Sequence, residues 1–298
     1  KPMLPISNYT GSFEVMPLDM ERDYEGINGL FELEQWPFIR ADLEVSHAQP
    51  HATAFVARSP EHLLGFFATH HFGNIGYLDM MIVDPKARVS RIAIKLYMKV
   101  SREMKRKGMG GWVAHSTNDS YRMFKLMRYT QGQSFTLLAR DAQSAEHSLP
   151  ELESLRLGLA DQDQLVELDR DVFGLARVDW VNTLLQQPTA QFYGRKMGGK
   201  LVASLCARER RGNAVCLDAV NGHSMQDLAP LLETTIDGLA DQRLECFVKT
   251  DSALHDYLLA KQFSVPPFFQ EIGPLVEWRK GNTGDIGLSE RVLSLSWF

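Results

Sequence analysis

The chain has 298 residues, of which 44% are hydrophobic and 23% are charged, and its net charge is −5. This is an ordinary globular composition with enough apolar material for one large or two ordinary domains. The charge excludes a general attraction to nucleic acid or membrane. No apolar run approaches the roughly 20 residues of a membrane span, and no signal peptide is visible, so we expect a cytoplasmic protein.

The cysteines indicate a reducing environment. Cys206, Cys216 and Cys246 are odd in number and share no CxxC spacing. That pattern favours reduced, buried thiols over a disulfide framework or a zinc site. His47, His51, His70 and His71 also lack the spacing of metal ligands, so we predict no metal.

Apolar periodicity and turn residues predict an alternation of strands and helices in the first half. A helix begins near Ser90 and ends at Gly108, where a glycine commonly stops a helix. The expected elements are a strand at 13–18, helices within 19–47, a hairpin of 54–57 with 63–68, a strand at 75–83, the helix at 90–107, a strand at 112–115, a helix at 121–129 and a strand at 134–140.

The second half repeats this order. The expected elements are a strand at 155–159, helices within 161–187, a hairpin of 191–195 with 201–205, a strand at 214–220, a helix at 224–240, a strand at 244–248, a helix at 252–261 and a strand within 268–278.

Short stretches of sequence repeat between the two halves as well. FVAR at 55–58 matches FYGR at 192–195, and LDMM at 78–81 matches LDAV at 217–220. A repeat of about 140 residues indicates two copies of one domain rather than a solenoid.

Two domains are therefore predicted, at 1–142 and 151–298. The polar stretch 141–148 lies between them and lacks both periodicity and large apolar residues. Such a stretch is typical of a linker.

The order of elements resembles the acyl-CoA-dependent N-acetyltransferase (GNAT) superfamily, twice over. The stretch from Asp171 to Arg177, followed by Trp180, is similar to two-domain acetyltransferases whose second half is a divergent copy of the fold. The resemblance implies an α+β chain of two tandem GNAT-like domains, each with a mixed, mostly antiparallel sheet flanked by helices.

The most specific motif follows the fourth strand. Val83-Asp-Pro85 matches the Val-x-Pro of that family, and Arg88 and Ala93 match the ends of its Arg/Gln-x-x-Gly-x-Gly/Ala loop, whereas Arg91 stands in place of the middle glycine. In the family this loop and the helix start hold a pyrophosphate through backbone N–H groups and the helix dipole. The implied CoA-binding residues are Met81, Ile82, Val83, Arg88, Val89, Ser90, Arg91, Ile92, Ala93, Asn118 and Phe124.

Charge supports a phosphate site in the first half. From Lys86 to Lys107 the sequence has nine basic residues and one acidic residue, Glu103. The equivalent segment 221–226 has no Lys or Arg. Arg91 either obstructs the backbone approach that glycine allows or binds the phosphate itself as a charged fork. A solvated basic helix face is the simpler alternative.

Three residues are candidates for the chemistry that the resemblance implies. Asp79, on the fourth strand, is a candidate general base, although Asp218 repeats its Leu-Asp context and so favours a structural role. His115, at the end of the fifth strand, is a second candidate base or an ordinary exposed histidine. Phe124 stands where the family has the Tyr that acts as its general acid. Tyr121, one turn earlier, either replaces that Tyr or is only a packing residue.

These residues favour an N-acyltransferase that moves an acetyl or other acyl group from CoA, its co-substrate, to a small amine. Glu32, Glu34 and Trp36 are expected near the amine. A catalytically silent CoA-binding or ligand-sensing protein and a ligand-free interaction scaffold remain open. No nucleic-acid partner is expected, because the basic run has Tyr97 as its one interleaved aromatic, and no membrane partner is expected either.

Overall fold

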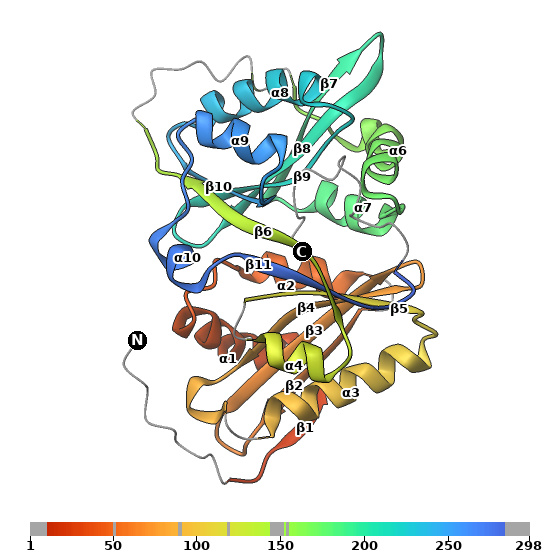
Figure 1. Cartoon of the computed structure of the whole chain (residues 1–298), viewed down its shortest axis with the longest axis vertical. Coiled ribbons are helices and arrows are strands. Elements are labelled where there is room, and N and C mark those ends of the chain that lie inside the picture. The colour runs from red at the N-terminus through yellow and green to blue at the C-terminus, as the bar shows by residue number, and fades with distance from the viewer. Residues whose placement is uncertain are drawn as a thin grey trace. The chain divides into compact units, whose positions relative to one another are not determined.

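The structure is a computed structural model that describes residues 11–49, 52–88, 91–117, 120–143, 152 and 155–283. It divides into two compact units, Lys1–Trp112 and Val113–Phe298 (Figure 1). Within the described residues, no helix is both long and apolar enough to cross a membrane.

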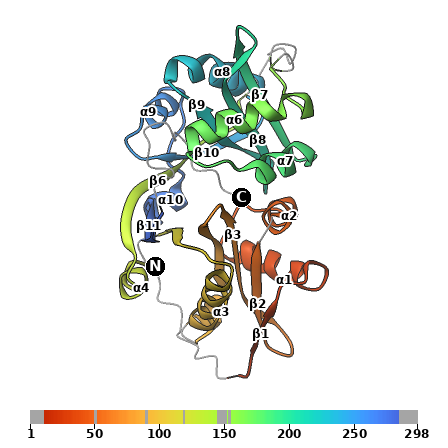
Figure 2. The same ribbon diagram turned by 90° about the vertical axis from the view of Figure 1, so that its right-hand side faces the viewer.

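The first unit is an antiparallel sheet with helices on both faces (Figure 2). Helix α3 packs on one face through a stripe at helical spacing, Ile92, Leu96, Val100 and Met104, each of which is fully buried. Gly76 lets α3 approach closely, because a Cβ there would lie 1.7 Å from the Met104 Cε. The elements are β1 (Glu14–Pro17), α1 (Met20–Leu33), α2 (Arg40–Ala48), β2 (Thr53–Arg58), β3 (Leu63–Phe72), β4 (Ile75–Val83) and α3 (Ile92–Arg106).

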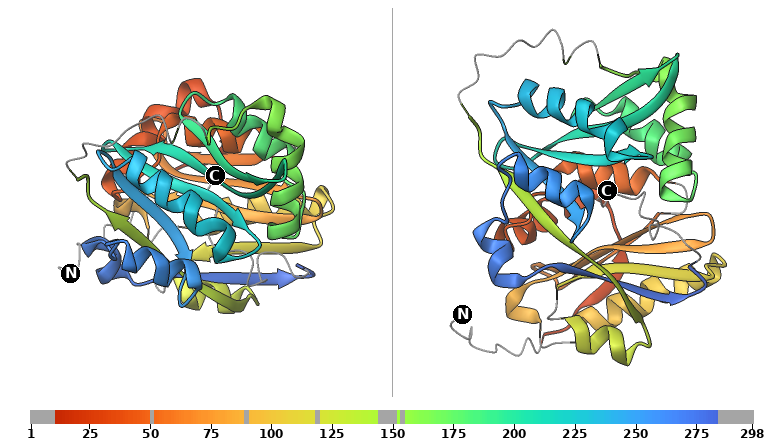
Figure 3. Two further views of the ribbon diagram at one scale, coloured as in Figure 1. Left: turned by 90° about the horizontal axis from the view of Figure 1, so that it is seen from above. Right: turned by 45° about the horizontal axis from the view of Figure 1, so that its top comes forward.

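The second unit contains a longer sheet in the strand order β5-β11-β6-β10-β9-β8-β7, and β5 begins at the end of the first unit. Helices α8 and α9 cover one face of its β7–β10 part, and α6 and α7 lie on the other (Figure 3). The elements are β5 (Gly111–Ser116), α4 (Tyr121–Leu126), β6 (Thr130–Arg140), α6 (Gln162–Phe173), α7 (Val178–Gln186), β7 (Ala190–Met197), β8 (Lys200–Arg210), β9 (Ala214–Gly222), α8 (Met225–Gly238), β10 (Arg243–Lys249), α9 (Ala253–Ala260), α10 (Pro267–Ile272) and β11 (Leu275–Gly281).

Strand β6 is shared by two neighbours. Its first part pairs with β11, from Thr130↔Arg279 to Phe135↔Leu275, and its remainder pairs with β10 up to Arg140↔Leu244. Strand pairing therefore links segments from both sides of the predicted domain boundary. The boundaries at 1–142 and 151–298 stay a prediction, and the expected linker is described only as far as residue 143.

The α+β class and most predicted elements are confirmed, with two differences. The strand expected at 155–159 is reduced to an isolated bridge, Arg156↔Tyr193, within the residues described there. The strand expected within 268–278 starts later, at Leu275, because the preceding residues form α10. Pro267 opens this helix, where the missing N–H of proline has no helical partner to lose.

Candidate active site

A β-bulge on β4 positions the candidate base. Phe67 pairs with Met81 and Thr69 with Leu78, so that Asp79 and Met80 lie opposite the single residue between them on β3. A bulge of this kind redirects side chains and is common beside active sites. Here it places Asp79 on the face of the sheet that α2 covers.

Asp79 is fully enclosed and holds its partners with one oxygen. The Ser46 hydroxyl of α2 donates to Asp79 Oδ2 at 3.0 Å, and His70 Nδ1 of β3 bonds to the same oxygen. Asp79 Oδ1 is buried and has no hydrogen-bond partner among the described residues. Burial raises the pKa of Asp79, while the contacts with His70 and Ser46 act in the opposite direction.

This arrangement suits proton transfer. A carboxylate whose pKa is raised by burial is a stronger base than an exposed one, and it is oriented here by two donors. Ser46 and His70 were not assigned to Asp79 from the sequence. The alternation of side chains along the strands could have indicated His70, because the turn that pairs His70 with Tyr77 puts both on the same face as Asp79. On that face the rings of His70 and Tyr77 stack, with their centroids 5.4 Å apart.

The basic loop after β4, residues 84–91, lies in the first unit. A short 3₁₀ turn at Pro85–Ala87 is capped by Asp84, whose Oδ1 accepts the N–H of Lys86 at 2.8 Å. The exposed Arg88 bonds through Nε to the Val83 carbonyl at 3.3 Å and pairs through Nη2 with Glu34 at 2.5 Å. Val89 and Ser90 lie outside the described residues.

Arg91 occupies the N-cap position of α3 with φ −76° and ψ 15°. These angles are open to any residue, so the backbone here does not require glycine. Its side chain is exposed and makes no capping bond, and Ile92 and Ala93 form the first helical turn. Within the described residues, no N-cap side chain accepts the first N–H groups of α3, which lie in a basic stretch of the sequence, and this fits a phosphate group.

The second unit holds a divergent copy of the same site. Strands β4 and β9 each have a register shift in this region, offset by one position. When Gly65↔Val83 is matched with Ala203↔Gly222, Asp79 and Asp218 each lie four residues before the matched residue of their strand. By this correspondence Asp218 takes the place of Asp79. It accepts hydrogen bonds from Arg208 Nη1 at 3.0 Å and Arg210 Nη2 at 3.1 Å, and all three side chains are buried.

Strands β9 and β10 pair in parallel over three residues, from Ala214↔Arg243 to Cys216↔Glu245. Beyond this point the Cys246 thiol donates to the Leu217 carbonyl at 3.2 Å. A side chain therefore satisfies the backbone where the two strands part. The predicted buried, free thiols are confirmed, and burial raises the pKa of Cys206 to about 12.

His115, Tyr121 and Phe124 lie in the second unit. The His115 ring is buried, with Nε2 3.8 Å from Glu277 Oε2, and burial lowers its pKa to about 4. Phe124 is buried and stacks on Trp278 at 5.2 Å, while Tyr121 meets the same indole edge-on at 5.4 Å and is 43% exposed. Asn118 lies outside the described residues.

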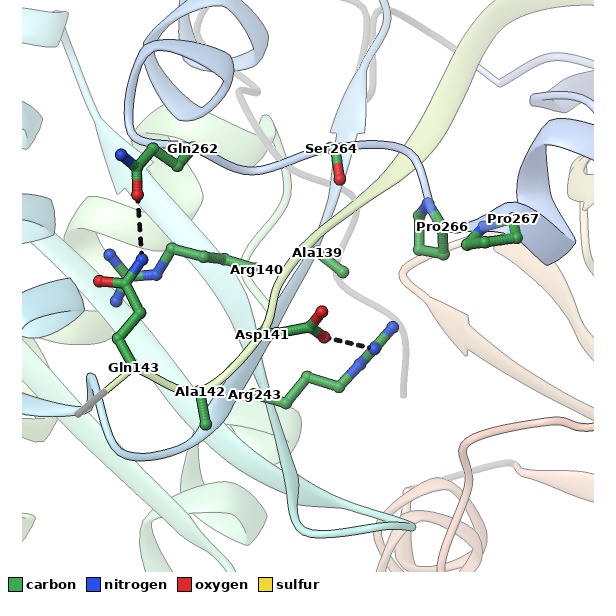
Figure 4. A pocket seen from close by; sticks show the side chains of 10 residues that line it. All are labelled: Ala139, Arg140, Asp141, Ala142, Gln143, Arg243, Gln262, Ser264, Pro266 and Pro267. Atoms are coloured by element: carbon green, nitrogen blue, oxygen red, sulfur yellow. Dashed lines mark hydrogen bonds and ion pairs between the residues drawn. The ribbon is translucent and has the colours of Figure 1, made fainter.

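A surface hollow of about 320 Å³ lies at the end of β6 (Figure 4). Arg243 pairs with Asp141 at 2.9 Å, and Gln143 bonds to Gln262 at 3.0 Å. None of the predicted site residues lines it. We therefore place the candidate chemistry at Asp79 rather than in this hollow.

Comparison with known proteins gives a family match for part of the chain and a fold for nearly all of it. Residues 19–128 match the model of the acetyltransferase (GNAT) family. No curated protein matches the chain. Solved structures resemble nearly all of it, at identities that support the fold alone, and three of them are described below.

A protein from Pyrococcus horikoshii, whose assignment as an acetyltransferase is provisional, has a TM-score of 0.74 and 12% identity, covering 97% of this chain and 96% of its own. A tandem GNAT protein of the clavulanic acid biosynthesis pathway has a TM-score of 0.61 and 14% identity, covering 91% and 98%. A GCN5-related N-acetyltransferase from Sphaerobacter thermophilus has a TM-score of 0.60 and 12% identity, covering 90% and 95%.

Proposed function

From the match of residues 19–128 to the acetyltransferase (GNAT) family model, and from the likeness of the whole chain to a tandem GNAT structure, we propose that the chain is an N-acyltransferase that uses acyl-CoA and a small amine. The first half binds CoA and carries the chemistry. The observation that supports this most directly is Asp79, which is buried at a bulge with one oxygen oriented and the other unpartnered among the described residues.

The residues of the first unit divide the work. Lys86, Arg88 and Arg91 hold the phosphates beside the start of α3, and the backbone of residues 81–83 holds the pantetheine arm. When bound, acyl-CoA supplies the thioester carbonyl that is transferred and the thiolate that leaves. Asp79 takes the proton that the amine nitrogen loses, and solvent protonates the thiolate.

The second half acts as a structural partner in this proposal. Asp218 is held by two buried arginines, Arg208 and Arg210. The stretch equivalent to the phosphate loop has no Lys or Arg, and Cys246 bonds to β9 where the strands part. Each feature favours a rigid scaffold over a second catalytic centre.

A catalytically silent CoA-binding protein is the second candidate. Phe124, at the place of the expected acidic Tyr, is packed into an aromatic cluster and has no hydroxyl to donate. A protein that only senses CoA keeps the basic loop and does not need a proton donor.

Two measurements decide between these functions. Mass spectrometry of the gently purified, intact protein detects retained CoA, which both candidates predict. Turnover of acetyl-CoA with a panel of amines, measured through the release of free thiol, is expected only if the protein is an enzyme. An Asp79→Asn variant should bind CoA normally and lose about 10²- to 10⁴-fold in kcat, the range for general acid–base groups. Full activity of this variant would remove Asp79 from the proposed mechanism.

A further inference from the structure

We propose that His70 is the positioning residue of the proposed proton acceptor: it donates its Nδ1–H to one oxygen of Asp79 and so leaves the other oxygen to accept the proton of the amine. The inference rests on the proposed function for its catalytic consequence. Its structural content, an oriented carboxylate–imidazole pair in a buried layer, is testable without any turnover.

The pair is fixed from several sides. Both His70 and Ser46 bond to Oδ2, which leaves Oδ1 as the unpartnered oxygen within the described part of the chain. The imidazole stacks on Tyr77 with 3° between the ring planes and meets Phe72 edge-on at 4.7 Å. The imidazole therefore cannot rotate away from Asp79 without disturbing the sheet.

The repeat supplies an internal comparison. His70 pairs across the strands with Tyr77, and Arg208 pairs in the same register with Cys216. The acid is thus the same in both halves, but its partner is an imidazole in the first and a guanidinium in the second. A carboxylate whose only task is to tie two strands together is served by either partner. A carboxylate that must take up a proton needs a partner without a permanent positive charge.

The other charged groups near the His70–Asp79 pair are engaged with partners of their own. The buried titratable side chains of α1 and α2 are Asp23 and Asp42 within the described residues, and Tyr77 on β4 is half-buried. Asp23 is paired with two arginines of its own, and Asp42 accepts the backbone N–H of Ile39 at 2.8 Å. Among the described residues, no Lys or Arg lies within ion-pair distance of Asp79.

The transfer step is balanced as follows. The nitrogen lone pair forms the bond to the acyl carbon, the carbon–sulfur bond breaks, and its electron pair leaves with sulfur. The proton lost by nitrogen moves to Asp79 Oδ1, and Asp79 returns it to solvent after the product leaves. The thiolate takes one proton from water. His70 keeps its proton throughout.

Three variants of the full-length protein test this assignment through the pH dependence of kcat/KM. His70→Gln keeps a neutral donor to Asp79, and we expect activity within about threefold of wild type. His70→Arg copies the second half, and we expect the rise of kcat/KM with pH to begin at least one pH unit lower, with a plateau reduced tenfold or more. His71→Gln, on the opposite face of β3, is the matched control and should leave the profile unchanged.

Nitrogen NMR of the wild-type histidines gives a readout that needs no activity. We expect the His70 signal, assigned by its loss in His70→Gln, to show a proton on Nδ1 that responds to Asp79→Asn. Equal losses in His70→Gln and His70→Arg without any shift of the pH profile would overturn the proposal, as would a His70 Nδ1 without a proton. If no donor and amine pair is turned over, the proposed function fails, while the NMR result still decides the pairing.

Discussion

The ring of Phe124 lies flat on the indole of Trp278, with centroids 5.2 Å apart and 7° between the planes. Phe124 belongs to the short helix α4 and Trp278 to the late strand β11. Phe124, which the sequence aligns with the general-acid Tyr of the family, therefore serves here in packing. The same contact anchors β11 to an element from the first half of the sequence.

Replacing Asp218 and replacing Asp79 should have opposite effects. Asp218→Asn leaves two buried guanidiniums without their carboxylate, and breaking a buried ion pair typically costs about 3–5 kcal/mol. We expect a large drop in the free energy of unfolding, measured with urea, and little change in kcat of the protein that remains folded. Asp79→Asn should lower kcat strongly and stability much less. A loss of catalysis in a folded Asp218→Asn protein would contradict the structural role of the second half.

Reversing the charges of Lys86 and Arg88 together should weaken CoA binding. The double change to Glu removes two cations from the loop and places a carboxylate beside Glu34, the present partner of Arg88. Exposed charges are screened over about 10 Å at 0.1 M salt, so the loss measured by calorimetry should be larger in low salt. Reversal of Lys105 and Arg106, at the far end of α3, is the control. An unchanged affinity for CoA would exclude the loop as the phosphate site.

Arg91→Gly separates a rebuilt phosphate loop from an obstructed one. The Arg91 backbone is unstrained and its side chain exposed, so we expect it to contact phosphate and its loss to weaken CoA binding ten- to a hundredfold, corresponding to about 1.5–3 kcal/mol. Folding is checked by circular dichroism, and little change is expected because glycine is tolerated at an N-cap position. Tighter binding by the folded variant would show that Arg91 obstructs the site.

Acid should destabilise the protein partly through His115. Burial lowers the pKa of His115 from 6.5 to about 4, so the unfolded chain binds a proton more readily than the folded one. The stability that this neutral ring contributes is present above pH 6.5 and is lost as pH falls toward 4, by about 3 kcal/mol in all. The thermal unfolding temperature of wild type should therefore fall more steeply with decreasing pH across this window than that of His115→Gln. Parallel curves would show that the ring is not buried in its neutral form.

The sequence predicted the repeat, the α+β class and the loop after β4 because each depends on local periodicity and spacing. It did not predict that Ser46 and His70 share one oxygen of Asp79, since that depends on how α2 packs and on a bulge that shifts the register by one residue. It also missed Glu277 beside His115, a contact between residues far apart in sequence that only the strand order reveals. The roles of Asp79, His115 and Tyr121 stay predictions.

The first half of the chain should not fold well by itself. Residues 1–142 contain β6 but lack β11, so the edge from Thr130 to Phe135 loses its partner and Phe124 loses Trp278. An unpaired edge beside an exposed aromatic cluster favours aggregation. We expect this fragment to be insoluble or partly unfolded by circular dichroism. Fusing residues 273–283 to it through a flexible linker should restore a cooperative transition, and the same fusion carrying Trp278→Ala should restore less. A stable, monomeric 1–142 fragment without the added strand would show instead that β11 is dispensable and that the predicted boundary separates two independent domains.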